Sequence, residues 1–499
     1  MTKMLNSSIR RSVHRLALIV VTLLTVVVIG APHAEAKSAP ESFADLADRL
    51  LPAVVNISTS QVIEGRSGAQ EMPQFPPGSP FEEFFKDFLD KQAPDQKKKT
   101  RKQTSLGSGF VIDYLKNGDA YVVTNNHVIQ DADEVYVILA DDTRLKADIV
   151  GRDNKTDLAV LKVHADRKLA SVGWGNSDKA RVGDWVVAIG NPFGLGGTVT
   201  AGIISARGRD IQAGPYDNFI QTDASINRGN SGGPMFNMAG EVIGINTAIY
   251  SPSGGSVGIG FAIPTSSARP VVEQLIKHGQ VRRGWLGVHI QVVTPAIAET
   301  LGMKKTEGAL VASVIDGGPA QNAGIRARDV IVEFDGKRVT EMRKLPRIVA
   351  STDVGRLVDV KVWRDGAMTT LKVDIAKMED DELVAEAPQN GTPKDKPTAE
   401  LKLGELGFTI APLTSATRTR FDLSDDSQGV VVVDVDPAGP AFDEGVRPGD
   451  VVAEVSQEKV ASLQDVQRLV RAAKDADKRS VLLLIEGQRG FRFVAISLL

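Results

Sequence analysis

The chain contains no cysteine, and several other features that mark common protein classes are also missing. The absence of cysteine among its 499 residues excludes disulfide bonds, a cysteine zinc site and a thiol nucleophile. The formal net charge of −3 gives no indication of a nucleic-acid partner or of a basic membrane-binding patch. No Gly-x-x-x-x-Gly-Lys-Ser/Thr string is present, so a P-loop for ATP is excluded. We expect no cofactor and no metal ion.

Only one apolar run approaches the length of a membrane-spanning helix, and it lies at the N-terminus. Basic residues precede this run, which covers residues 16 to about 30, and the small-x-small pattern Ala34-Glu35-Ala36 follows it. This order is typical of a signal peptide, which we predict over residues 1–36 with cleavage after Ala36. An uncleaved membrane anchor is the alternative. Export predicts a periplasmic protein in a cell with two membranes.

The most informative motif is a glycine-rich turn around a serine, Gly229-Asn230-Ser231-Gly232-Gly233-Pro234. A serine nucleophile requires backbone N–H groups aimed at the oxyanion that forms on its substrate. Glycines allow the sharp turn and the close approach of substrate. The motif therefore predicts Ser231 as a nucleophile, with the N–H groups of Gly229 and Ser231 as the oxyanion hole. A plain glycine turn is the alternative interpretation of the motif taken alone.

Two residues upstream of this motif favour the catalytic interpretation. His127 follows a β-rich run that ends in Thr-Asn-Asn, and Asp157 stands immediately before an apolar strand. In isolation, a packed histidine and a turn aspartate would be ordinary. Together with Ser231 they give the chain order His, Asp, Ser, which is the chymotrypsin order. In that arrangement Ser231 attacks, His127 transfers the proton, and Asp157 orients the imidazole.

Several motifs together resemble the HtrA/Do family of trypsin-fold serine proteases, near its DegP-like periplasmic branch. They cover residues 107–112, 124–129, 156–160, 188–194, 221–234 and 258–264. The resemblance implies a mostly β fold, with a trypsin-like double six-stranded β-barrel protease domain followed by two PDZ domains. It also implies homotrimers and larger assemblies.

The residue that sets charge preference in trypsin-like enzymes lies six places before the serine. That position is Ser225 in this chain and carries no charge. By resemblance, Ile226 and Ile263 are expected to line the primary pocket with Ser225, and a small apolar pocket suggests cleavage after Val or Ala. Such residues are normally buried, so this pocket would favour unfolded proteins. Ordinary core packing is the alternative for both isoleucines.

The protease domain is predicted over residues 37–280, with a long insertion near 61–104 whose position matches the regulatory loop of the family. This insertion is rich in Pro, Gly, Gln and Lys, as a loop would be. Four phenylalanines nevertheless fall at i, i+3, i+4 and i+7, which is one face of a helix: Phe81, Phe84, Phe85 and Phe88. A helix buried in this domain is one interpretation, and an aromatic stripe that docks on another subunit is the one we favour. Residues 271–279 predict a short helix with a glycine stop.

The remaining chain contains a repeat. Gly308, Pro319, Gly324 and Asp329 recur as Gly429, Pro440, Gly445 and Asp450, all 121 residues later. This spacing fits two small duplicated domains, which resemble PDZ domains over residues 281–378 and 404–499. Charge-rich and proline-rich residues 379–403 predict a flexible linker.

Each PDZ-like domain has one loop that is expected to bind a peptide C-terminus. The loop of the first domain holds Trp285, Leu286, Gly287 and Val288, and that of the second holds Leu406, Gly407 and Phe408. Such loops offer N–H groups to a carboxylate, and the next strand accepts the peptide as an added strand. A plain turn into a strand is the alternative for each loop.

These features predict an ATP-independent periplasmic serine endopeptidase, of the peptidase Do type, that degrades misfolded or unassembled envelope proteins. The expected partners are unfolded proteins and their C-terminal peptides, and the resemblance also implies chaperone activity. Two alternatives stay open. One is a PDZ-bearing chaperone or scaffold with a vestigial barrel, and the other is a narrow regulatory protease in envelope stress signalling.

Overall fold

The computed structural model describes residues 40–63, 101–191, 197–227, 229–252, 255–378, 400–488 and 490–498. The predicted signal peptide and the four phenylalanines of the insertion lie outside these residues. In the described part of the chain, no helix is long and apolar enough to cross a membrane. Helix α2 (Ala44–Leu50) and the 3₁₀ turn η1 (Leu51–Ala53) precede the first barrel.

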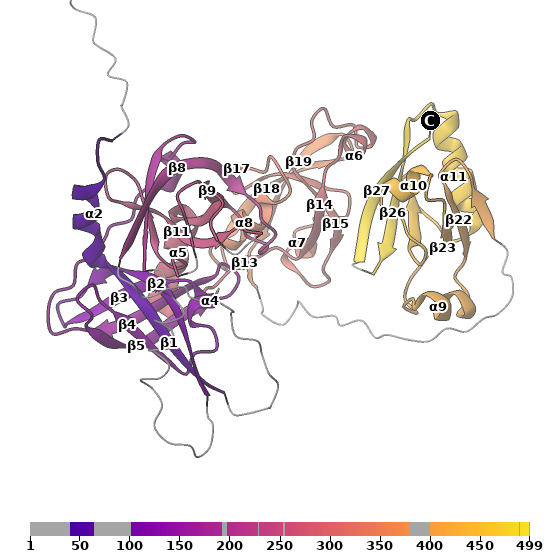
Figure 1. Ribbon diagram of the computed structural model, residues 1–499. Coiled ribbons are helices and arrows are strands. Elements are labelled where there is room, and N and C mark those ends of the chain that lie inside the picture. Colours follow the sequence, from indigo (N-terminus) through magenta and orange to yellow (C-terminus); the bar gives the residue numbers. More distant parts are fainter. Residues whose placement is uncertain are drawn as a thin grey trace, which may run out of the picture. The chain divides into compact units, whose positions relative to one another are not determined.

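Six antiparallel strands close the first barrel in the order β1-β2-β3-β6-β5-β4 (Figure 1). They are β1 (Val54–Ile63), β2 (Arg101–Tyr114), β3 (Asp119–Thr124), β4 (Glu134–Ile138), β5 (Arg144–Asp153) and β6 (Leu158–His164). Alternate side chains point inward, as the period of two requires, and Ile57, Val122 and Leu161 are among those that fill the barrel. Strands β1 and β2 stay paired as far as Ile63 and Arg101. The insertion expected near 61–104 is therefore shorter at both ends.

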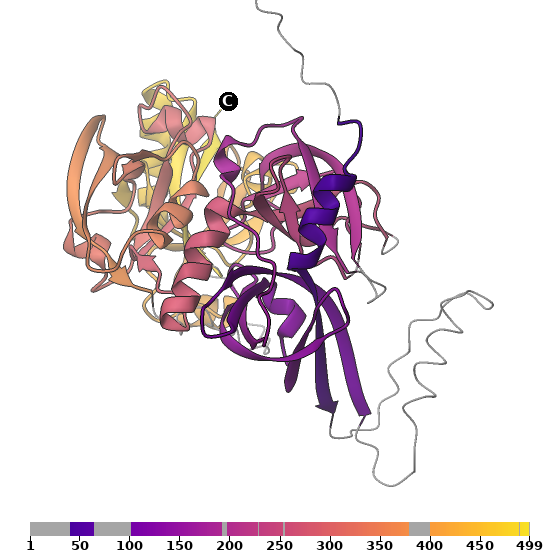
Figure 2. The same ribbon diagram turned by 90° about the vertical axis from the view of Figure 1, so that its left-hand side faces the viewer.

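A second closed barrel follows, in the order β10-β11-β12-β9-β8-β7. Its strands are β7 (Trp185–Gly190), β8 (Thr198–Arg209), β9 (Phe219–Thr222), β10 (Pro234–Phe236), β11 (Val242–Ile249) and β12 (Gly260–Pro264). In Figure 2 the purple strands of the first barrel close into a ring. The two six-stranded barrels confirm the predicted trypsin-like fold.

Helix α5 (Thr265–His278) follows the second barrel and begins six residues before the predicted helix. It begins before Pro270, which lies within its second turn. The helix ends at Gly279 in a left-handed conformation, which confirms the predicted glycine stop.

The main sheet of the first PDZ domain (PDZ1) has the order β14-β15-β16-β18-β19, with β17 paired to β16. Its strands are β13 (Gly284–Trp285), β14 (Val288–Val292), β15 (Ala309–Val314), β16 (Val330–Phe334), β17 (Lys337–Arg338), β18 (Leu357–Arg364), β19 (Ala367–Asp374) and β20 (Ala376–Lys377). Its helices are α6 (Pro295–Thr300), α7 (Pro319–Asn322) and α8 (Lys344–Ala350). The short strands β13 and β20 pair with each other.

The second PDZ domain (PDZ2) repeats this plan with one strand added, in the order β21-β22-β23-β24-β26-β27. Its strands are β21 (Leu401–Leu403), β22 (Phe408–Pro412), β23 (Val430–Val435), β24 (Val451–Val455), β25 (Glu458–Lys459), β26 (Ser480–Gly487) and β27 (Gly490–Ser497). Its helices are α9 (Ser415–Phe421), α10 (Pro440–Asp443) and α11 (Leu463–Asp475). Residues 401–403, expected to belong to the linker, form β21 because they pair with β22.

Candidate active site

His127 lies on the one-turn helix α4 (Asn126–Ile129), directly after strand β3. The two residues before it tie this corner to the next loop. The Asn125 side-chain amide and the Asn126 backbone N–H both donate to the Asp157 carbonyl, at 2.8 and 3.1 Å. The His127 side chain is 45% exposed. The strand end therefore presents an accessible imidazole beside the Asp157 turn.

Asp157 occupies the turn between β5 and β6, with a φ of 55°. Its carboxylate accepts hydrogen bonds from His127 Nδ1 at 2.7 Å and from the His127 backbone N–H at 2.9 Å. A carboxylate only accepts, so Nδ1 carries the proton in this contact and the neutral ring has a free lone pair on Nε2. This is the orientation that a general base requires.

Thr247 on β11 is a third member of this network that the sequence did not reveal. Its hydroxyl donates to Asp157 Oδ2 at 2.8 Å, across 90 positions of sequence. Its carbonyl faces Ser231 Oγ at 3.5 Å. A threonine in an apolar strand carries no local signal for this role, because only the packing of the second barrel against the first brings it to the aspartate.

Ser231 lies in the turn before β10. Gly232 next to it has a φ of 86°, and a Cβ there would lie 2.2 Å from the Ser108 carbonyl. Only glycine fits such a position without strain.

The structure joins His127 to Asp157 directly. Among the described residues, the hydroxyl of Ser231 bonds only the Thr247 carbonyl, and catalytic hydrogen bonds to serine are often loose without substrate.

The two N–H groups predicted to form the oxyanion hole are those of Gly229 and Ser231. In the described part of the chain, neither has a hydrogen-bond acceptor. The Gly229 carbonyl is turned to the buried Ser108, whose hydroxyl donates to it at 2.6 Å and accepts from the Asn191 N–H at 2.7 Å. Ser108 therefore fixes the orientation of the Gly229 carbonyl, which belongs to the same residue as one of the predicted oxyanion-hole N–H groups.

The three residues expected to line the primary pocket differ in their burial and in the direction of their side chains. Ser225 is exposed, whereas Ile226 is 2% exposed and packs in the core of the second barrel with Ala262. Ile263 follows Ala262 on β12, so its side chain points to the opposite face of that strand. The packing of Ile226 fits the core alternative and Ile263 faces away from that core, while a place for either residue in the substrate pocket stays a prediction.

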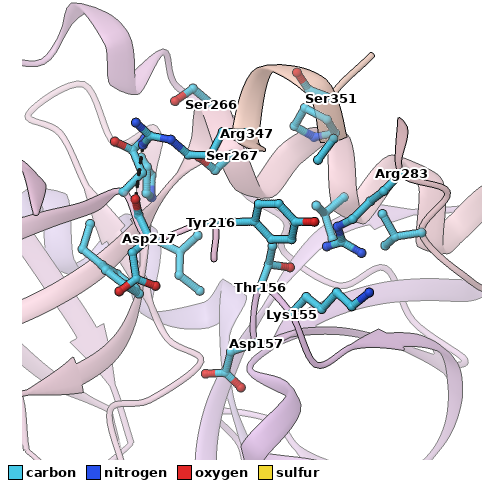
Figure 3. Close-up of a pocket in the computed structure, with 18 of the residues that line it drawn as sticks. Lys155, Thr156, Asp157, Tyr216, Asp217, Ser266, Ser267, Arg283, Arg347 and Ser351 are labelled. Atoms are coloured by element: carbon cyan, nitrogen blue, oxygen red, sulfur yellow. Dashed lines mark hydrogen bonds between the residues drawn. The ribbon is translucent and has the colours of Figure 1, made fainter. Parts of the chain in front are cut away.

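Ile263 instead lines a cavity of about 420 Å³ behind the Asp157 turn. Figure 3 shows the Tyr216 ring in this cavity, with Arg283 and Lys155 near its hydroxyl end. Burial raises the pKa of Tyr216 and lowers that of Arg347, which donates to the Asp217 carbonyl at 3.3 Å. Neither shift involves His127 or Asp157.

The Asp157 turn is held from this side by a buried ion pair. Arg283 binds Asp153 through two hydrogen bonds of 2.9 and 2.5 Å, and both side chains are less than a tenth exposed. Asp153 in turn accepts from the Thr156 N–H at 3.1 Å and from its hydroxyl. Arg283, directly before β13, thus supports the turn that carries Asp157.

The two predicted peptide loops occupy equivalent places in their domains. The Leu286 carbonyl accepts from the Ala320 N–H, and the Leu406 carbonyl accepts from the Ala441 N–H. Leu286, Leu406, Gly407 and Phe408 are buried, and Trp285 and Val288 are half-buried. The described residues contain no cluster of His, Asp or Glu that could hold a metal ion.

Comparison with known proteins agrees with this architecture. Residues 107–245 match the family described as "Trypsin-like peptidase domain", and residues 284–375 and 404–488 match "PDZ domain". The chain is 46% identical over 474 residues to "Probable periplasmic serine endoprotease DegP-like" of Brucella suis biovar 1, covering 91% of this chain and 89% of that protein. The Rhizobium meliloti protein of the same name is 44% identical over 476 residues, covering 91% of each. The solved structure "HtrA-type protease AlgW with decapeptide" superposes with a TM-score of 0.55 at 41% identity, covering 68% of this chain and 99% of that one.

Proposed function

Because this chain belongs to the family of DegP-like serine endoproteases of the HtrA type, we propose that it is an ATP-independent periplasmic endopeptidase of misfolded envelope proteins. The single observation that carries the proposal is the contact of His127 Nδ1 with the Asp157 carboxylate at 2.7 Å. Because that bond engages Nδ1, Nε2 is left to act as the base. The imidazole follows the end of a strand, as the sequence predicted.

In the proposed mechanism Ser231 Oγ attacks the peptide carbonyl while His127 Nε2 takes its proton. Asp157 stabilises the imidazolium that forms, and His127 then protonates the leaving amine. The N–H groups of Gly229 and Ser231, which have no acceptor among the described residues, donate to the oxyanion. Water, deprotonated by His127, finally releases the acyl group from Ser231.

We assign substrate selection to two features, the unfolded state of the client protein and the binding of its C-terminus by PDZ1. The chain has no P-loop to drive unfolding, so clients must present extended segments by themselves. The loop of Trp285, Leu286, Gly287 and Val288 would take their C-terminal carboxylates. Homotrimers and larger assemblies, with chaperone activity, belong to the same proposal, and sedimentation of the mature protein tests the assembly.

Localisation is proposed from the predicted signal peptide and from relatives whose names include the word periplasmic. Processing after Ala36 would give a mature chain that begins at Lys37. N-terminal sequencing of the protein from a periplasmic extract tests this, and a retained N-terminus in the membrane fraction would support an anchor instead.

The deciding experiment is digestion of reduced casein by the mature protein and by Ser231→Ala, without ATP, with the products sequenced. We expect cleavage by the unchanged protein alone. If neither protein cuts but both suppress aggregation of an unfolded client, the endopeptidase proposal fails and a chaperone remains. A proteome-wide search for cleaved proteins would separate broad degradation from cleavage of a single regulatory protein.

A further inference from the structure

The two PDZ domains differ at the strand edge where a peptide would add. In the described part of PDZ1, β14 pairs with β15 alone, and its other edge is open. The equivalent strand of PDZ2, β22, pairs with β23 on one edge and with β21 on the other. A β-strand has only two edges, so β21 lies on the edge of β22 that corresponds to the open edge of β14.

The direction of β21 is that of a captured peptide. It runs antiparallel to β22, with Leu403 opposite Phe408 and Leu401 opposite Ile410. A peptide held by its C-terminal carboxylate at the loop and added to the next strand must also end beside that loop. Leu403 is therefore in the place of a terminal residue, and Leu401 is two positions upstream of it.

The loop N–H groups of PDZ2 are already in use. Those of Leu406 and Gly407 both donate to the Leu403 carbonyl, at 3.0 and 2.9 Å. In the described part of PDZ1, the N–H groups of Leu286 and Gly287 have no acceptor. The carbonyl of Leu403 thus takes the donors that a peptide carboxylate would need.

The two leucines of β21 also pack on the hydrophobic core of PDZ2. Leu403 is 8% exposed and belongs to one core cluster with Phe408 on β22 and Val466 on α11. Leu401 packs against the same cluster, whereas Lys402 between them is exposed. At the loop, Glu405 forms an ion pair of 2.6 Å with Lys474 of α11.

We propose that the peptide groove of PDZ2 is occupied by the chain's own segment Leu401–Leu403, which excludes C-terminal peptides as long as β21 is paired. The groove accordingly fits an extended segment with leucines two positions apart. PDZ1 is then the one domain of the pair with an open groove among the described residues. The comparison with PDZ1 depends on the proposed peptide binding by that domain, but the occupancy of PDZ2 does not.

The test is hydrogen–deuterium exchange of the full chain, made Ser231→Ala to prevent self-cleavage, with and without a peptide. The probe is the hexapeptide Thr-Ala-Glu-Leu-Lys-Leu, which copies residues 398–403 and has a free carboxylate. We expect the backbone amides of residues 408–412 to be protected from exchange without the probe. Adding the probe should not change that protection. Leu401→Asp/Leu403→Asp should expose them, and the probe should then restore protection at least about tenfold, as expected for a peptide that adds as a strand. Lys402→Glu is the matched control and should behave like the parent.

Fast exchange of 408–412 in the parent, with protection gained on adding the probe, would overturn the proposal. The readout is confined to PDZ2, so inactive protease or a PDZ1 that binds nothing leaves it unaffected.

A second test covers the case in which the double aspartate variant does not fold. The chain is free of cysteine, and Lys402 lies opposite Thr409. K402C/T409C should form an intramolecular disulfide under mild oxidation, because the two positions face each other across the strand pair. K402C/T419C, with the second cysteine on α9, should not. Equal rates for the two pairs would show that β21 does not lie on β22.

Discussion

The hydroxyl of Thr247 and the imidazole of His127 bind the same oxygen of Asp157, at 2.8 and 2.7 Å. The threonine therefore holds the Asp157 carboxylate in place, and this carboxylate in turn orients the His127 imidazole. Among the described residues its hydroxyl bonds only Asp157, so Thr247 acts as a positioning residue.

Replacing Thr247 tests that role. A hydrogen bond to a charged group contributes about 1.5–3 kcal/mol, so Thr247→Val should lower kcat for a casein-derived peptide about tenfold to a hundredfold with little change in KM. Thr247→Ser keeps the hydroxyl and should stay within about threefold of the parent. Full activity of the valine variant would remove Thr247 from the mechanism.

Removing one partner of the buried Arg283–Asp153 pair should strongly destabilise the fold around the Asp157 turn. Arg283→Met leaves a buried carboxylate without its partner, which costs about 3–5 kcal/mol in the free energy of unfolding. The exposed pair Arg269–Glu273 supplies the control, because Arg269→Met should cost less than about 1 kcal/mol. Urea unfolding on the Ser231→Ala background measures both, and equal midpoints would contradict the expectation.

Gly232 should be irreplaceable at the active-site turn. Gly232→Ala would force a Cβ against the Ser108 carbonyl and the Thr124 hydroxyl, at 2.2 and 2.3 Å, and would strain the positive φ. A reacting group displaced by about 1 Å loses about a hundredfold in rate, and we expect at least that loss of casein turnover. Gly173→Ala meets no atom within 4 Å and should leave turnover unchanged.

Ile226 should behave as a core residue and not as a specificity residue. Ile226→Ala removes a side chain that is 2% exposed and should cost about 2–5 kcal/mol of stability. The neighbouring Ser225→Ala, on an exposed position, should change stability by less than about 0.5 kcal/mol. Product sequencing completes the test, because unchanged stability with a broadened cleavage preference would restore Ile226 to the substrate pocket.

Asp119 should make the first barrel more stable near neutral pH than in acid. The hydrogen bond from His164 holds the pKa of Asp119 below its ordinary value of 3.8. A lowered carboxyl pKa stabilises the fold above the unfolded-state pKa, and that contribution disappears as the pH falls through the folded-state pKa. Asp119→Asn should therefore lower the urea midpoint near pH 6 and have little effect at about pH 2. A pH-independent difference would contradict this assignment.

The sequence by itself determined the fold class, and it predicted the residues of the candidate site. Glycines around Ser231, a histidine after a strand and an aspartate before one are local signals, because each depends on a few neighbouring residues. The duplicated Gly, Pro and Asp positions indicated the two PDZ domains in the same way. The His127–Asp157 contact follows from these signals once the first barrel closes.

Only the tertiary structure decided which distant residues meet. Thr247 reaches Asp157 across 90 positions and Arg283 reaches Asp153 across 130, and neither contact leaves a local pattern. Ile226 is a pocket residue by resemblance only, and the burial of its side chain in the second barrel is a result of the tertiary structure. Leu401–Leu403 lie in a segment whose composition predicted a linker, but an open strand edge and an apolar groove gave those two leucines a place to pair. Local composition reports what a segment can do in isolation, whereas pairing partners are chosen by the edges and cavities that the whole fold leaves unfilled.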